Sequence, residues 1–154
     1  MDLSRIEQIG AVKAIGIRML AVHQLIYERT GGRIGHRVLG VPCLLLHTVG
    51  AKTGQPRVSG LVYARDGQDY LVVASNGGAS RAPGWYHNLL ANPDAQVQVG
   101  TASHHVTAHA VHPGDATYER LWDAVNKANH NRYRAYQRAT DRPIPIVALS
   151  PNKS

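Results

Sequence analysis

The 154-residue sequence predicts an α+β protein in which helices cover an antiparallel β-barrel. Roughly six short apolar runs are separated by turn residues, which is typical of antiparallel sheets. Helical patterns occur at the beginning, in the middle and towards the end, without the strand–helix alternation of a parallel sheet, so the pattern argues against a Rossmann fold. Asp66-Gly67 lies between two strand-like runs and strongly indicates a tight hairpin.

The first expected element is a helix over residues 3–29. Residues 1–40 form an N-terminal helix and linker in this prediction, and residues 41–154 form the barrel domain. Ser4 followed by Glu7 matches a capping box. The apolar positions at helical spacing are Ile15, Met19, Val22 and Ile26. The basic residues between them are Arg5, Lys13 and Arg18. Two interpretations remain open: packing on the barrel or on the partner of a homodimer, and peripheral binding to an anionic membrane.

The barrel is expected to begin with two buried strands. Cys43–Leu46 and Tyr70–Ala74 are short apolar runs rich in Leu and Val and bounded by turn residues. Between them, Gly50–Arg57 forms a basic loop that leads through a further strand to the Asp66-Gly67 hairpin. The order strand, basic loop, strand, hairpin and strand therefore forms the first half of the predicted barrel.

A helix, a second hairpin and a further helix are expected to follow. Ser80 or Pro83 can begin a helix that Asn92-Pro93 must end. Gln96–Val99 alternates polar and apolar residues and precedes a turn and a strand over His104–Val111. The helically spaced apolar residues of the next helix are Tyr118, Leu121, Trp122 and Val125. A polar segment over Asn126–Arg142 leads to a closing strand over Ile144–Leu149, whose Pro145 restricts it to an edge or to the strand start.

The net charge of +7 calls for an acidic partner. A nucleic acid, an anionic membrane and a phosphorylated small molecule all satisfy this charge. The basic residues are not gathered in one block, which argues against a nucleic-acid-binding tail. The sole cysteine, Cys43, has no partner for an internal disulfide, and no secretory signal or long apolar span is seen, so a cytoplasmic location is expected.

The Gly50–Arg57 loop is the first candidate binding element. A glycine-containing turn exposes backbone N–H groups, Lys52 supplies a compact cation, and Arg57 can bind phosphate or carboxylate oxygens through two donors. The spacing of a P-loop is missing, and Pro56 leads into a strand where a P-loop would need a helix. Anion binding and an ordinary solvated turn both remain open.

No metal site is predicted from the histidines His104, His105, His109 and His112. His105 and His109 share a strand face but lie about 13 Å apart at the usual rise per residue, which is too far for two ligands of one ion. No nucleophile with a nearby base is evident, and a buried Cys43 would be a poor nucleophile.

Tyr133 and Tyr136 are spaced to share one face of a helix. They can simply pack in a core. Their neighbours are mostly polar, however, so we interpret them as a partly exposed pair that forms the wall of a pocket for a flat ligand.

Several ordered motifs resemble the deazaflavin (F420)-dependent nitroreductase family of actinobacterial reductases, and the F420H2-dependent quinone reductases in particular. These motifs, which cover most of the chain beyond residue 41, are Gly50-x-Lys52-Thr53-Gly54-Gln55-Pro56-Arg57, Arg65-Asp66-Gly67, Ala74–Gly78, Pro83-x-Trp85-Tyr86-x-Asn88-Leu89, Ala91-Asn92-Pro93, Val97-Gln98-Val99 and Thr140–Ile146. The resemblance implies a split β-barrel, which agrees with the barrel argued above. It also implies the cofactor F420.

The resemblance also implies roles for individual residues. The residues that would hold the phosphate and glutamyl tail of F420 are Lys52, Thr53, Gln55, Pro56 and Arg57. The residues beside the deazaflavin ring would be Ala74, Ser75, Asn76, Gly77, Gly78, Trp85 and Asn88. Tyr133 and Tyr136 match tyrosines of the acceptor-side wall, and Ser75 matches a serine that orients the acceptor, so these three are the expected catalytic residues.

Three positions depart from the nitroreductase pattern. Asn76 replaces a lysine, and Val62 and His130 replace tyrosines that line the pocket in nitroreductase-type members. The expected activity is therefore hydride transfer from reduced F420 to a quinone or another electron-poor organic acceptor, with no nucleic acid as partner. The alternatives are an FMN-binding split-barrel oxidoreductase and an F420-binding protein without turnover.

Overall fold

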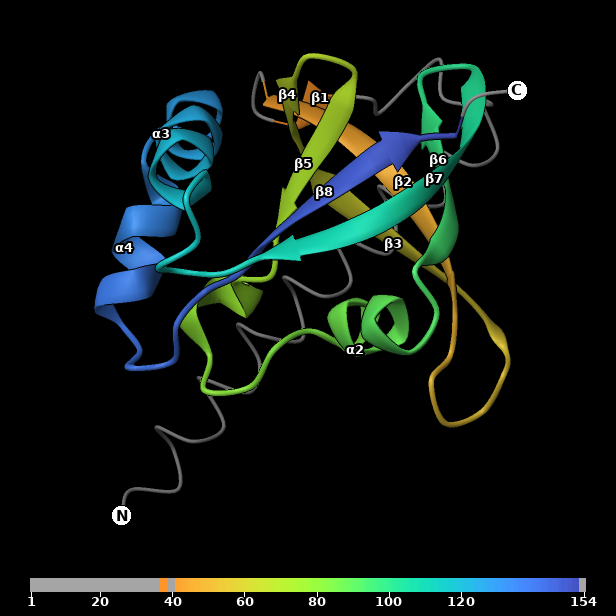
Figure 1. Cartoon of the computed structure of the whole chain (residues 1–154), viewed down its shortest axis with the longest axis horizontal. Coiled ribbons are helices and arrows are strands. Elements are labelled where there is room, and N and C mark those ends of the chain that lie inside the picture. Colours follow the sequence, from red (N-terminus) through yellow and green to blue (C-terminus); the bar gives the residue numbers. More distant parts are fainter. Residues whose placement is uncertain (1–36, 39–40, 153–154) are drawn as a thin grey trace, which may run out of the picture.

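The computed structural model describes residues 37–38 and 41–152, in which eight strands form one curled antiparallel sheet (Figure 1). The strands are β1 (Arg37–Val38), β2 (Val41–Val49), β3 (Pro56–Val62), β4 (Ala64–Asp66), β5 (Asp69–Val73), β6 (Asp94–Val99), β7 (Ala102–Val111) and β8 (Ile146–Pro151). The helices in this part of the chain are η1, a 3-10 turn (Asn76–Gly78), α2 (Gly84–Ala91), α3 (Tyr118–Ala128) and α4 (Arg132–Arg138). The predicted α+β class is confirmed. The helix expected over 3–29 and the domain boundary at residue 40 lie outside the described residues.

The sheet has the order β1-β2-β6-β7-β8-β5-β4, and β3 pairs with β2. β2 is hydrogen-bonded to β3 from Cys43↔Val62 to Val49↔Pro56, and to β6 around Leu46↔Val97. Because Val49 at the end of β2 pairs with Pro56 at the start of β3, the backbone is fixed on both sides of the basic loop.

Two hydrophobic cores lie on opposite faces of the sheet. Tyr70 and Val72 of β5 belong to the core that α2 covers, whereas Leu71 and Val73 belong to the core beneath α3 and α4. β8 alternates in the same way, which explains why both strands read as continuous apolar runs. In Figure 1, α3 and α4 lie together beside β5, and α2 lies separately near the loop between β2 and β3.

The corner between α3 and α4 depends on a buried asparagine. Asn126 has no exposed surface, donates from Nδ2 to the Trp122 carbonyl and accepts the backbone N–H of Arg134 at 2.9 Å. His130 and Asn131 reverse the chain with φ values of 56° and 60°. The helix expected around Tyr133 and Tyr136 is confirmed as α4, which packs on α3 through Trp122 and Tyr133, whose ring centroids lie 6.4 Å apart.

The structure differs from the sequence prediction in three places. The strand expected between the loop and the hairpin is divided at Tyr63 into β3 and β4. The hairpin loop is Gly67-Gln68, because Asp66 pairs with Asp69, and Gly67 adopts φ +58° at the first central position, where type II′ turns place glycine. The closing strand is Ile146–Pro151 and not Ile144–Leu149; β8 is internal, and Pro145 directly precedes it, which confirms the expected place of this proline at the strand start.

None of the helices in the described part of the chain is long and apolar enough to span a bilayer.

Candidate functional site

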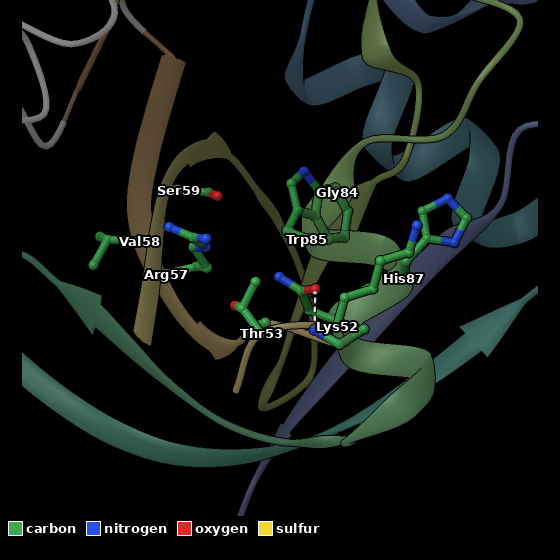
Figure 2. Close-up of a pocket in the computed structure, with 11 residues that line it drawn as sticks. Lys52, Thr53, Arg57, Val58, Ser59, Gly84, Trp85 and His87 are labelled. Carbon is green, nitrogen blue, oxygen red and sulfur yellow. Dashed lines mark hydrogen bonds between the residues drawn. The ribbon is translucent and has the colours of Figure 1, made fainter. Parts of the chain in front are cut away.

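A cavity of about 480 Å³ opens between the loop after β2, the start of β3 and the beginning of α2 (Figure 2). Its lining residues are Gly50, Ala51, Lys52, Thr53, Arg57, Val58, Ser59, Gly84, Trp85, His87 and Asn88. We call it the cationic cavity. Among the described residues, neither Lys52 nor Arg57 forms an ion pair with an acidic side chain.

The cationic cavity is suited to an anion. Arg57 extends from β3 towards Trp85, and Lys52 extends along α2 towards His87 (Figure 2). Gly84 places the first turn of α2 at the cavity, where unpaired backbone N–H groups and the helix dipole favour negative charge. Two exposed cations and a helix N-terminus therefore converge without a carboxylate partner in the described structure.

The loop that carries Lys52 is closed by its own backbone. The Gly50 N–H donates to the Gln55 carbonyl at 2.8 Å, and the Gly54 N–H donates to the Gly50 carbonyl at 2.9 Å. The Thr53 hydroxyl accepts the Gln55 N–H at 3.2 Å, so it stabilises the turn as well as lining the cavity. A Cβ at Gly50 would lie 2.5 Å from Thr53 Oγ1, which explains the glycine at this position.

Asn88 fixes the loop to α2. Its Oδ1 accepts the Ala51 N–H at 2.9 Å, and its Nδ2 donates to Thr48 Oγ1 at 3.2 Å. Thr48 is buried on β2. One amide side chain therefore joins the helix, the strand and the loop, and it positions Lys52 through the preceding residue.

A second cavity, of about 300 Å³, lies between β3, η1 and α4. Its lining residues are Gly60, Leu61, Val62, Val73, Ser75, Asn76, Gly77, Pro83, Trp85, Asn129, Tyr133 and Tyr136. We call it the tyrosine cavity. Aromatic and aliphatic side chains form most of its wall, and Ser75, Asn76 and Asn129 supply polar groups, which is a composition suited to a flat, partly polar ligand.

One wall of the tyrosine cavity is the backbone of residues 75–78. Asn76, Gly77 and Gly78 have φ values of 46°, 64° and 82°. A Cβ on Gly77 would meet no atom within 4 Å, whereas a Cβ on Gly78 would lie 2.7 Å from the Tyr136 carbonyl oxygen. Gly77 therefore leaves open space at the cavity, and Gly78 allows η1 to approach α4 closely.

A second wall of the tyrosine cavity is the tyrosine pair. The rings of Tyr133 and Tyr136 lie edge to face with centroids 6.3 Å apart. The expectation that both are partly exposed is wrong for Tyr133, which is 6% exposed because it packs against Trp122. Burial raises the pKa of the Tyr133 phenol to about 12, and a hydrogen bond from Asn129 opposes this shift. Tyr133 is therefore a neutral hydrogen-bond donor at physiological pH.

Arg142 forms hydrogen bonds with the backbone of the segment that carries Ser75. Its guanidinium donates to the carbonyl oxygens of Ala74, Ser75 and Ala79 at 3.1, 2.9 and 3.2 Å. Arg142 comes from the segment between α4 and β8, so it joins the two walls of the tyrosine cavity.

Trp85 lines both cavities and is 7% exposed. It is the second residue of α2, and its ring also belongs to the core beneath the sheet. An elongated ligand with one anionic end and one flat end could therefore pass Trp85 and occupy both cavities.

The structure brings together most, but not all, of the residues expected at the site. Those that line the cationic cavity are Lys52, Thr53, Arg57, Trp85 and Asn88, and those that line the tyrosine cavity are Ser75, Asn76, Gly77, Trp85, Tyr133 and Tyr136. Gln55, Pro56, Ala74 and Gly78 support these cavities without lining them. Val62 lines the tyrosine cavity, but His130 does not.

Sequence reasoning missed four polar residues of the site. Ser59 and His87 line the cationic cavity, Asn129 lines the tyrosine cavity, and Arg142 holds the segment behind it. Ser59 could have been found, because it follows Arg57 by two residues on one face of a strand. The other three depend on contacts between elements that are distant in the sequence.

Comparisons with known proteins connect this geometry to a function. The sequence model of the F420H(2)-dependent quinone reductase family matches residues 19–151. An F420H(2)-dependent quinone reductase of Mycobacterium tuberculosis is 54% identical over 151 residues, which cover 97% of this chain and 99% of the relative.

Two solved structures are similar to this chain, and one of them carries the name of such a reductase. One is described as an F420-H2 dependent reductase; it is 34% identical, has a TM-score of 0.64 and covers 71% of this chain and 94% of its own. The other is described as a domain-swapped dimer; it is 31% identical, has a TM-score of 0.66 and covers 90% of this chain and 99% of its own.

Proposed function

The chain belongs to the F420H(2)-dependent quinone reductase family, and from this membership we propose that it transfers a hydride from reduced F420 to a quinone or a similar electron-poor organic acceptor. The observation that supports this activity best is the pair of cavities that meet at Trp85. One is cationic and suits an acidic tail, and the other is lined by aromatic and polar side chains and suits a ring and an acceptor.

The residues of the cationic cavity fit the anionic tail of F420. Lys52 and Arg57 would bind phosphate or carboxylate oxygens, and Thr53 and the first turn of α2 would add donors. Asn88 would act through the loop, since both ends of its amide are already hydrogen-bonded within the chain. FMN carries no polyanionic tail and would leave Lys52 with less to bind.

The residues of the tyrosine cavity fit a ring and an acceptor side by side. Gly77 leaves the space that a planar ring needs close to the backbone. Ser75 and Asn76 would contact the ring and orient the acceptor, and Trp85 would close one side. A ring and an acceptor stacked there would bring the hydride donor close to the acceptor, as hydride transfer requires.

When bound, reduced F420 supplies the hydride chemistry. The chain supplies the position of the two reactants and a hydrogen bond for the acceptor. The Tyr133 phenol, whose pKa is raised to about 12, remains protonated and can donate to a quinone oxygen as negative charge develops there. Tyr136, which is nearer to solvent, is the second candidate donor.

The first test is a pair of binding titrations with F420 and with FMN. A charge-assisted hydrogen bond contributes about 1.5–3 kcal/mol, so Arg57→Ala should weaken F420 by roughly tenfold or more. Lys52→Ala should also weaken F420, by less where solvent screens the charge, and added salt should weaken the wild type. Arg65→Ala removes the same charge outside both cavities and serves as the matched control.

The outcome separates the alternatives. Tighter binding of FMN than of F420 would identify an FMN-dependent oxidoreductase instead. F420 binding without quinone reduction would identify a binding protein. Equal F420 affinity in the Arg57, Lys52 and Arg65 variants would show that the cationic cavity is not the tail site.

We further propose, from the sequence, that the chain forms a homodimer in the cytoplasm and that its N-terminal segment makes peripheral contact with anionic membranes at their inner face. The domain-swapped dimer among its structural relatives supports the dimer. Analytical ultracentrifugation tests the assembly, and co-sedimentation with anionic liposomes at low salt tests the membrane contact. A monomer, or equal recovery in the supernatant with and without liposomes, contradicts the respective proposal.

A further inference from the structure

We propose that Arg142 is a positioning residue for hydride transfer: it fixes the distance between the backbone wall at residues 74–79 and the tyrosine wall on α4. This inference rests on the proposed function, because those two walls would hold the cofactor ring and the acceptor. The claim about the wall itself depends only on the contacts of the chain.

The guanidinium of Arg142 donates its hydrogen bonds to backbone carbonyl oxygens, and we call this arrangement the backbone clamp. Nη1 donates to the Ala74 carbonyl at 3.1 Å, Nη2 donates to the Ser75 carbonyl at 2.9 Å, and Nε donates to the Ala79 carbonyl at 3.2 Å. Within the described part of the chain, no acidic side chain forms an ion pair with it. Three donors from one rigid plane reach both ends of a six-residue segment, which a lysine ammonium cannot reproduce.

Two of the three clamped carbonyls, those of Ala74 and Ser75, have few other partners available, whereas Ala79 is exposed. Ala74 is fully buried and Ser75 is 7% exposed, so water has little access to this part of the wall. The Gly78 N–H also donates to the Ser75 carbonyl, at 2.9 Å, so this oxygen accepts both the hydrogen bond that closes the η1 turn and one from Arg142. Removing the guanidinium would leave buried carbonyl groups under-satisfied, and the turn would have to rearrange.

The other end of the clamp is anchored to α4. Gln137 donates from Nε2 to the carbonyls of Arg142 and Thr140 at 2.9 and 3.2 Å, and its Oε1 accepts the Ile144 N–H at 3.0 Å. Gln137 directly follows Tyr136 on the same helix. The strap over residues 140–144 is therefore tied to the helix that carries both cavity tyrosines.

The two anchors together determine the width of the tyrosine cavity. Ser75 and Gly77 lie on one wall, and Tyr133 and Tyr136 lie on the other. The walls are separated by more than fifty residues of sequence, and Arg142 bridges them from a third segment. Because hydride transfer requires close approach of donor and acceptor, a shift of about 1 Å between these walls would slow the reaction by up to a hundredfold.

The experiment compares Arg142→Gln and Arg142→Lys with the wild type and with Arg138→Gln, which alters an exposed arginine at the end of α4. The first readout is amide hydrogen exchange of the protein without cofactor. The protected amides to follow are Ala74, Gly78 and Ala79, which donate to Pro145, Ser75 and Asn76. Both Arg142 variants should exchange at these amides roughly tenfold faster or more, while the loop at residues 50–55 is unchanged.

The second readout is kinetic, with menadione as the quinone probe. At saturating F420H2, kcat should fall by roughly tenfold or more in Arg142→Gln and should recover only in part in Arg142→Lys. The Kd for F420 should change by less than about threefold, because the cationic cavity is intact. If Arg142→Gln does not fold, amide exchange and kcat are both measured on Arg142→Lys.

Unchanged exchange at the three amides would overturn the proposal. So would full recovery by Arg142→Lys, since charge alone would then suffice, or weaker F420 binding with an unchanged kcat. A wild-type protein that fails to bind F420 would refute the proposed function, and the exchange experiment would still decide whether Arg142 holds the wall.

Discussion

Replacing Gly78 by alanine should destabilise the protein much more than replacing its neighbour Gly77. Both residues adopt positive φ, +82° and +64°, so each alanine costs about 1–2 kcal/mol of backbone energy. At Gly77 the new methyl group meets no atom within 4 Å. At Gly78 it would lie 2.7 Å from the Tyr136 carbonyl oxygen and 3.1 Å from Ala139 Cβ, and backbone cannot move aside as a flexible side chain can.

The crowding at Gly78 adds about 1–3 kcal/mol, which is the usual cost of overpacking. For a chain of this length, each kcal/mol lowers the melting temperature by about 2–4 °C, so Gly78→Ala should melt roughly 2–12 °C below Gly77→Ala. Thermal unfolding of both variants, followed by far-ultraviolet circular dichroism, measures the difference. Equal melting temperatures would refute the reasoning, because the backbone penalty is common to both and only the contact with α4 separates them.

Two further predictions concern the loop and the buried phenols. Asn88→Leu removes two hydrogen bonds, so it should cost about 1–3 kcal/mol of stability and weaken F420 binding although Lys52 and Arg57 are unchanged, whereas Asn88→Asp keeps the acceptor for the Ala51 N–H. Parallel denaturation and F420 titration of both variants separate the loss of stability from the loss of affinity, and full F420 affinity in Asn88→Leu would contradict the role assigned to the amide. Burial raises the pKa values of Tyr118 and Tyr133 to about 12, so the native state retains protons that the unfolded state loses near pH 10. The contribution of these phenols to the free energy of unfolding should therefore be constant below pH 10 and fall as the pH rises towards 12. Urea unfolding at a series of pH values should show a smaller decline in Tyr118→Phe, and a decline as steep as that of the wild type would contradict the assignment.

Much of the site was predictable because its signals are local. The turn at Gly50–Gln55, the start of α2 at Pro83 and the apolar strands β2 and β5 each follow from a short stretch of sequence. These elements alone place Lys52, Arg57 and Trp85 around the cationic cavity. The resemblance to a known family assigned Lys52 and Arg57 to the cofactor tail and Trp85 to the ring.

The tertiary contacts were not predictable from local patterns. Tyr133 lies in a polar helix of seven residues, so the sequence suggested partial exposure, but Trp122 of α3 covers its ring. The division of the strand at Tyr63 reflects the curvature of the sheet, which has no marker such as proline or glycine at that position. Arg142 lies in the Thr140–Ile146 motif, but its hydrogen-bond partners were not predictable, since they lie 63 to 68 residues away.

The place of Trp85 between the two cavities gives the protein its own optical probe. The chain contains two tryptophans, and the second, Trp122, lines neither cavity but is stacked on Tyr118 and packs against Tyr133, which lines the tyrosine cavity. A ligand therefore changes the emission of Trp85 by direct contact and that of Trp122 only through Tyr133. With Trp122→Phe, occupancy of either cavity becomes readable in the unlabelled protein, even for ligands that have no absorbance of their own.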